Sequence, residues 1–145
     1  MLSNFSFWIW GTIVMQLLTA LFHSLSFISR AKPRNDMEKK LVEIVTSYKI
    51  DMGGGIERTY YNLFIGVSAC FTLIFILGGV LNWYFLKTGI SANAWKGFLL
   101  IQLIIYGLVF FLQIRFTFWP PIIVSGLVFL FLAGTCFLSA LPGES

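Results

Sequence analysis

The stretch YYNLFIGVSACFTLIFILGGVLNWYFL, residues 60–86, contains no charged side chain. A helix of about 20 residues crosses the roughly 30 Å hydrocarbon core of a bilayer, so this stretch is longer than one crossing requires. Its apolar residues run continuously and do not alternate with polar ones, which favours a helix over a barrel strand. We therefore predict a membrane-spanning helix over residues 60–86.

Three further stretches, residues 7–28, 94–114 and 121–141, are apolar and long enough for the same role. Of the 145 residues, 58% are hydrophobic and only 11% are charged, whereas about a quarter of the residues of a soluble domain are charged. We predict an all-α membrane protein with one domain, residues 1–145, in which four transmembrane helices form an antiparallel bundle.

The charged residues are concentrated between the first two spans. Seven of the ten basic residues lie there, and the turn after the third span adds an eighth on the same side: Arg30, Lys32, Arg34, Lys39, Lys40, Lys49, Arg58 and Arg115. The other side has Lys87 and Lys96. Because basic loops stay in the cytoplasm, we predict that the 29–59 loop is cytoplasmic and that both termini lie outside the cytoplasm.

This loop is expected to contain an amphipathic helix over about residues 35–49. Asn35 is a capping residue, and an apolar face follows at helical spacing, formed by Met37, Leu41, Ile44, Val45 and Tyr48. Such a helix either rests on the lipid headgroups or acts as a lid or docking surface for a partner. The glycine-rich residues 51–58 are expected to form a flexible hinge before the second span.

Polar residues follow one face of each span. The first span has Thr12, Gln16, Thr19, His23, Ser26 and Arg30, the second has Ser68, Thr72 and Asn82, and the third has Gln102, Tyr106 and Gln113. Polar side chains that face lipid are costly, so these stripes should meet inside the bundle as a polar seam. We expect Gln16 and Gln102 inside, and Phe75 and Phe110 facing lipid or a partner.

The single histidine, His23, lies near the predicted cytoplasmic end of the first span. An ionisable residue within a membrane is a candidate site, and Asn62 and Gln113 are near enough in depth to hydrogen-bond it. The candidate seam or ligand site comprises His23, Gln16, Thr19, Asn62, Gln102, Tyr106 and Gln113. A cytoplasmic rim is expected from Arg30, Glu57, Arg58, Tyr61 and Arg115. His23 either makes structural hydrogen bonds, accepts a proton, or donates to a quinone or lipid headgroup.

Several kinds of chemistry are not expected. One histidine and no pair of intramembrane carboxylates argue against a metal site. The carboxylates lie in or beside the cytoplasmic loop, so a Ser-His-Asp triad is not supported either, and we predict no cofactor. Cys70 and Cys136 form no C-x-x-C motif. The basic residues indicate membrane orientation and give no support to nucleic-acid binding.

The segment ERTYYNLFIGVSACFTLIFILGGVLN, residues 57–82, with a histidine late in the first span, resembles small bacterial four-helix membrane proteins. The resemblance covers roughly residues 1–85 and rests on the aromatic start of the second span and the Gly-x-Ser step at Gly66 and Ser68. It implies the topology above, in a bacterial inner membrane, and it brings no assigned activity.

Two classes of function remain open at this point. The first is a non-catalytic membrane protein, either an accessory subunit of a larger complex or a small binder of lipid or another apolar ligand. The second is a small membrane enzyme or transporter for an apolar substrate that uses His23 to handle protons. The first is favoured because the chain lacks a convergent set of catalytic groups. Expected partners are the bilayer, other membrane subunits or further copies of the chain, and a bound lipid or quinone.

Overall fold

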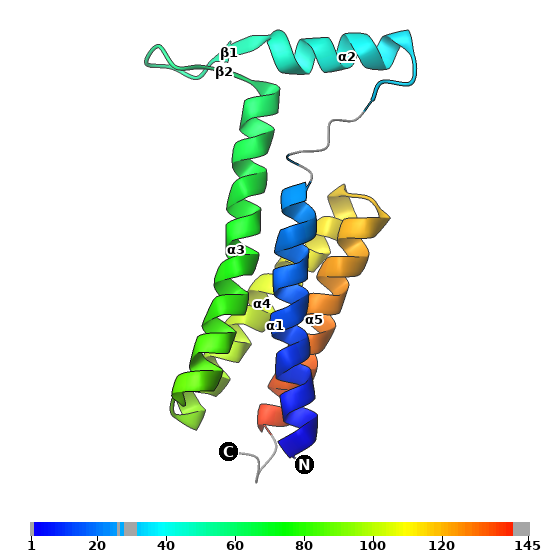
Figure 1. Ribbon diagram of the computed structural model, residues 1–145. Coiled ribbons are helices and arrows are strands. Elements are labelled where there is room, and N and C mark those ends of the chain that lie inside the picture. Colours follow the sequence, from blue (N-terminus) through cyan, green and yellow to red (C-terminus); the bar gives the residue numbers. More distant parts are fainter. Residues whose placement is uncertain (1, 26, 28–31, 141–145) are drawn as a thin grey trace. The chain divides into compact units, whose positions relative to one another are not determined.

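The computed structural model describes residues 2–25, 27 and 32–140. Over this range the chain forms five helices and one two-stranded hairpin (Figure 1): α1 (Leu2–Leu25), α2 (Asp36–Ser47), β1 (Lys49–Asp51), β2 (Glu57–Thr59), α3 (Tyr60–Thr88), α4 (Ala92–Phe116) and α5 (Trp119–Ala140). The chain divides into a first unit, Met1–Ala20 with Ile74–Ser145, and a second unit, Leu21–Leu73. Helices α1 and α3 each contribute to both units.

Four of the helices are long and apolar enough to cross a membrane, and they correspond to the four predicted spans. Their ends differ from the prediction by a few residues. Helix α1 begins at Leu2 and ends at Leu25, whereas Ile28, its predicted end, lies outside the described residues. Helix α5 begins at Trp119 because Pro120 and Pro121 fit its first turn, where no intrahelical N–H donor is needed.

In the first unit, α1 and α5 approach each other through two reciprocal contacts between a glycine and an aromatic ring. A Cβ atom added at Gly11 would overlap the Phe131 ring, and one added at Gly134 would overlap the Trp8 indole. The two aromatic rings also contact each other, with centroids 5.5 Å apart. Two large rings therefore occupy the space that side chains at these two glycines would fill, which brings the helices close together.

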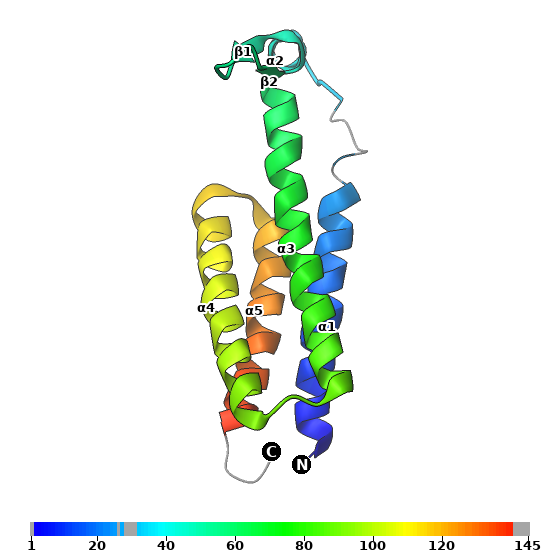
Figure 2. The same ribbon diagram turned by 90° about the vertical axis from the view of Figure 1, so that its left-hand side faces the viewer.

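Helices α4 and α5 lie side by side and use the same arrangement (Figure 2). Phe110 of α4 lies against Gly126 of α5, where an added Cβ would be 2.9 Å from the ring, and Phe129 of α5 lies against Gly107 of α4, at 3.1 Å. The Phe110 and Phe129 rings are stacked, with centroids 5.9 Å apart and an interplanar angle of 19°. Glycines therefore allow close packing at both of these contacts of α5, the one with α1 and the one with α4.

The prediction that Phe75 faces lipid or a partner is wrong. Phe75 is 0% exposed, and its ring centroid lies 5.1 Å from that of Tyr106 in α4. Phe110 is half-buried against Gly126. Phe75 lies on the same helical face as Ser68, Thr72 and Asn82, at steps of four, three and seven residues, and the structure buries this face.

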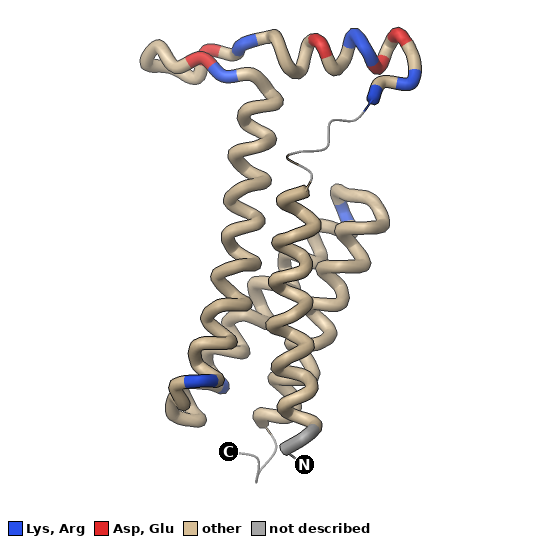
Figure 3. The backbone as a smooth tube through the Cα atoms, viewed as in Figure 1, with Lys and Arg blue, Asp and Glu red and all other residues tan. Residues whose placement is uncertain are grey.

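The second unit contains the charged segment, with α2 and the β1–β2 hairpin (Figure 3). The side chain of Asn35 caps α2 by accepting from the backbone N–H of Glu38 at 2.8 Å, as the sequence predicts. The helix ends at Ser47, earlier than the predicted residue 49, because Lys49 pairs with Thr59 as the first residue of β1.

The segment predicted as a hinge forms the tip of this hairpin. Gly53, Gly54 and Gly55 all have positive φ angles, between 65° and 88°, which only glycine adopts readily. The backbone N–H of Met52 donates to the carbonyl of Ile56 at 2.9 Å and closes the turn. Three consecutive glycines therefore allow the chain to reverse directly before α3.

Candidate functional site

Three buried amide side chains form a cluster inside the first unit. Gln16 of α1 and Asn82 of α3 are 0% exposed, and Gln102 of α4 is 5% exposed. Gln16 donates from Nε2 to Gln102 Oε1 at 3.0 Å, and Asn82 donates from Nδ2 to Gln16 Oε1 at 2.9 Å. The cluster therefore links three helices that are distant in sequence.

Within this amide cluster, Asn82 and Gln102 form a reciprocal pair. Asn82 Nδ2 donates to Gln102 Oε1 at 3.1 Å, and Gln102 Nε2 donates back to Asn82 Oδ1 at 2.9 Å. Gln16 adds one bond to each member of the pair. Neutral amides do not change protonation state near neutral pH, so the amide cluster suits helix association and offers no acid or base.

Tyr106 adjoins this cluster and explains why residue 78 is glycine. The Tyr106 hydroxyl donates to the backbone carbonyl of Ile74 at 2.9 Å. A Cβ atom at Gly78 would overlap this hydroxyl and would lie 2.7 Å from Gln16 Nε2. The tyrosine hydroxyl can reach the backbone of α3 because Gly78 leaves the space free.

A second polar contact joins α1 to α5. Thr12 and Thr135 are both 0% exposed, and their Oγ1 atoms lie 3.2 Å apart. Each hydroxyl also lies within hydrogen-bond distance of a carbonyl in its own helix, Trp8 and Phe131 respectively. The two hydroxyl protons can form only two of these three hydrogen bonds. One hydrogen bond to a backbone carbonyl is therefore lost whenever the threonines bond each other. Thr19 similarly donates to the Met15 carbonyl at 2.6 Å.

His23 belongs to the second unit, where it is half-buried between aromatic rings. Its ring centroid lies 5.0 Å from that of Phe71 and 6.1 Å from that of Phe27. Asn62, its proposed partner, is exposed and lines a groove of the second unit with Arg58 and Cys70. Ser26, on the same predicted stripe, lies outside the described residues.

The residues of the predicted rim are largely exposed. In the hairpin, Glu57 forms an ion pair with Lys49, with Oε2 and Nζ 3.4 Å apart, and Arg58 donates to the backbone carbonyl of Glu57. Tyr61 is half-buried at the start of α3. An exposed ion pair of this kind contributes about 0–1 kcal/mol, so it adds little stability.

The remaining rim and seam residues lie at the end of α4 or outside the described range. Arg115 is exposed in the last turn of α4, with its guanidinium carbon 5.6 Å from the centroid of the Phe116 ring. Gln113 is half-buried, and its Oε1 atom has no hydrogen-bond partner among the described residues. Arg30 lies outside the described residues.

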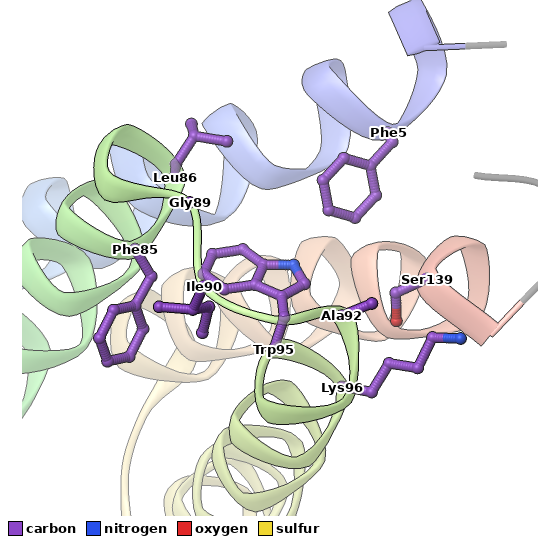
Figure 4. Close-up of a pocket in the computed structure, with 9 residues that line it drawn as sticks. All are labelled: Phe5, Phe85, Leu86, Gly89, Ile90, Ala92, Trp95, Lys96 and Ser139. Carbon is purple, nitrogen blue, oxygen red and sulfur yellow. The ribbon is translucent and has the colours of Figure 1, made fainter. Parts of the chain in front are cut away.

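A cavity of about 280 Å³ lies at the α3–α4 turn of the first unit (Figure 4). Most of its lining is apolar, and its polar side chains are those of Lys96 and Ser139; the full lining is Phe5, Phe85, Leu86, Gly89, Ile90, Ala92, Trp95, Lys96 and Ser139. In Figure 4, Phe85 and Ile90 lie on one side of the Trp95 indole, and Lys96 and Ser139 lie on the other. Phe5 and Ala92 lie on the same side as Lys96 and Ser139, so the two polar side chains adjoin apolar ones.

Neither this cavity nor the central role of Asn82 follows from the sequence alone. From the sequence, Asn82 is only one member of a polar stripe, although an asparagine within a long apolar span is itself a signal of interhelical bonding. From the sequence, Lys96 serves only to indicate the orientation of the chain in the membrane. Among the described residues, no three His, Cys, Asp or Glu side chains are grouped so that they could hold a metal ion.

The chain matches no family model, no curated protein and no solved structure.

Proposed function

We propose that this chain is a non-catalytic integral membrane protein that binds a lipid-like molecule. Its four long helices would cross the bilayer as an antiparallel bundle. The observation that carries the proposal is a contrast within the first unit: the buried amides bond one another, whereas the cavity beside Trp95 is mostly apolar. Ligand sites in proteins are mostly apolar with few polar groups, and this cavity has that composition.

The bonding of the seam supports a non-catalytic role. A catalytic site needs a nucleophile or a base that can reach a substrate, with groups to stabilise the charge that develops. Gln16, Asn82 and Gln102 are neutral amides bonded to one another, and the Tyr106 hydroxyl is bonded to a backbone carbonyl. Their polar groups are thus used to hold the helices together.

The charged segment supports the proposed orientation, with the 29–59 loop in the cytoplasm. The apolar side chains of α2 are exposed, among them Met37, Leu41 and Ile44, and no residue of α2 is buried. Lys39 and Lys40 lie on the same helix. An exposed apolar face together with lysines suits a helix that lies in the membrane interface against anionic headgroups. A bacterial inner membrane is the location we propose.

The orientation predicts the labelling of single-cysteine variants. In a background with Cys70→Ala and Cys136→Ala, we expect Lys87→Cys to react with a membrane-impermeant thiol reagent in intact cells. Lys39→Cys should react only after the cells are opened, because the basic loop stays in the cytoplasm. Both positions are exposed, so access depends on the side of the membrane. Labelling of residue 39 and not of residue 87 in intact cells would contradict this orientation and support the opposite one.

Native mass spectrometry of the full chain from mild detergent tests the function itself. We expect a population carrying one retained lipid, and we expect Ala92→Phe, which would fill the cavity, to lose that population. Ala94→Phe is the matched control, because Ala94 is exposed on the same helix and does not line the cavity. Retention that survives Ala92→Phe would contradict the proposal, and a stoichiometric partner chain without lipid would favour an accessory subunit.

A second candidate function is a small membrane enzyme or transporter in which His23 handles protons. It is favoured by one observation, the half-burial of the single histidine between Phe71 and Phe27. Histidine is the side chain whose charge ordinarily changes between pH 5 and 8.

The variant His23→Gln separates the two functions, because glutamine keeps a donor and an acceptor and does not titrate. For a non-catalytic protein, we expect lipid retention at pH 5.5 and pH 7.5 to be the same in His23→Gln as in the wild type. Retention by the wild type that changes several-fold between these pH values, and is constant in His23→Gln, would instead support proton handling.

A further inference from the structure

We propose that the cavity at the α3–α4 turn binds the headgroup end of an anionic amphiphile, with the Lys96 ammonium facing a carboxylate or phosphate. This inference rests on the proposed lipid-binding function and adds to it the charge of the ligand. The ligand class is an acyl chain that carries an oxyanion, either a fatty acid or an anionic phospholipid.

The lining of the cavity matches the two parts of such a molecule. Phe85, Ile90 and Trp95 provide an apolar surface for the first carbons of an acyl chain. Lys96 lies on the opposite side of the indole in Figure 4 and provides an ammonium, whereas the Ser139 hydroxyl beside it donates to the Cys136 carbonyl at 2.8 Å. A neutral apolar ligand would leave the Lys96 ammonium facing hydrocarbon, which is unfavourable for a charged group.

The charge balance of the first unit also favours an anion. Lys96 is half-buried and makes no ion pair within the described residues. None of the described residues of the first unit is acidic. Within the described part of the chain no carboxylate lies beside this partly buried ammonium, which therefore attracts an anionic ligand more strongly than an exposed lysine does.

The size of the cavity limits what enters it. Sites for whole small molecules have volumes of about 300–1,000 Å³, and this cavity has about 280 Å³. It can therefore hold the headgroup-proximal part of a lipid, while the rest of the chain remains in the bilayer.

Photolabelling of the full chain in phosphatidylcholine nanodiscs tests this inference. Three probes carry a diazirine near the carboxyl end of the acyl chain: phosphatidylglycerol, palmitate and phosphatidylcholine. Cross-linked residues are mapped by mass spectrometry over residues 85–96. We expect the two anionic probes to label this segment about fivefold more than phosphatidylcholine, the size of effect that one lysine has on an anionic lipid. The anionic probe that labels more strongly distinguishes a phospholipid from a fatty acid.

Two substitutions assign this preference to Lys96. We expect Lys96→Gln to remove the fivefold preference and to leave the weaker phosphatidylcholine labelling unchanged. Lys87→Gln is the matched control, because Lys87 is exposed, lies close in sequence and does not line the cavity. It should keep the full preference. An equal loss in both variants would overturn the inference and indicate general surface charge.

The outcomes also separate this inference from the proposed function. Equal labelling of residues 85–96 by all three probes would overturn the anionic preference and leave lipid binding in place. Absence of labelling at residues 85–96 by any probe would overturn both.

Discussion

Replacing Gly134 by Ala should lower the free energy of unfolding by about 1–3 kcal/mol, the usual cost of forcing an extra methyl group into a well-packed contact. The added Cβ would overlap the fused rings of the Trp8 indole. Because the indole is rigid, it can relieve this overlap only by moving as a whole. A shift of the Trp8 indole would also displace the Phe131 ring, which contacts Trp8 and lies against Gly11. Unfolding in detergent micelles by added denaturing surfactant measures the effect.

Gly97→Ala is the matched control for this substitution. Gly97 is also within a long helix, but a Cβ atom there would meet nothing within 4 Å. It should be neutral or slightly stabilising, because alanine has the higher helix propensity. A combined Trp8→Leu and Gly134→Ala variant should lose less than the sum of the single losses, since the smaller side chain removes the overlap. Equal losses for Gly97→Ala and Gly134→Ala would contradict the α1–α5 contact.

Asn82→Leu should destabilise the protein about one and a half times as much as Gln16→Leu. Asn82 takes part in three of the four hydrogen bonds of the amide cluster, whereas Gln16 takes part in two. At about 0.6 kcal/mol for each bond within a membrane, the expected losses are about 1.8 and about 1.2 kcal/mol. Removal of Gln16 leaves the reciprocal Asn82–Gln102 pair intact, so that variant should still fold.

The same unfolding measurement tests this order. Asn62→Leu is the matched control, because Asn62 lies on the same helix and is exposed. Its effect should stay within about 0.5 kcal/mol, as for surface substitutions in general. If Gln16→Leu were as damaging as Asn82→Leu, the amide cluster would not be organised around the Asn82–Gln102 pair.

Residues of the candidate site differed in how well the sequence alone could place them. Gln16 and Gln102 were expected inside because a polar group in an apolar helix avoids lipid, and the structure buries both and bonds them to each other. The sequence does not predict that Asn82 hydrogen-bonds both of them, because the choice of partner depends on how each helix is rotated about its axis. His23 was singled out as the only histidine, and its aromatic neighbours Phe71 and Phe27 were not foreseen.

The sequence by itself determined the four long apolar helices and the segregation of charge into the 32–59 segment. These are local properties, because a span needs only a sufficient run of apolar residues and a helix start needs only a capping side chain such as Asn35. The resemblance to small bacterial four-helix membrane proteins, and the orientation, stay predictions.

Only the tertiary structure decided which apolar residues are buried and where a ligand could enter. Phe75 is buried and Phe64 is exposed, although both are phenylalanines of α3 with apolar neighbours. Gly11, Gly107, Gly126 and Gly134 each receive an aromatic ring from another helix, and the cavity beside Trp95 forms where α1, α3, α4 and α5 bring nine residues together. Hydropathy describes the transfer of each residue into lipid, and it has the same value for a phenylalanine that faces lipid and one that faces a neighbouring helix. The choice between these environments depends on the shapes of the surfaces that meet, which exist only once the helices are packed together.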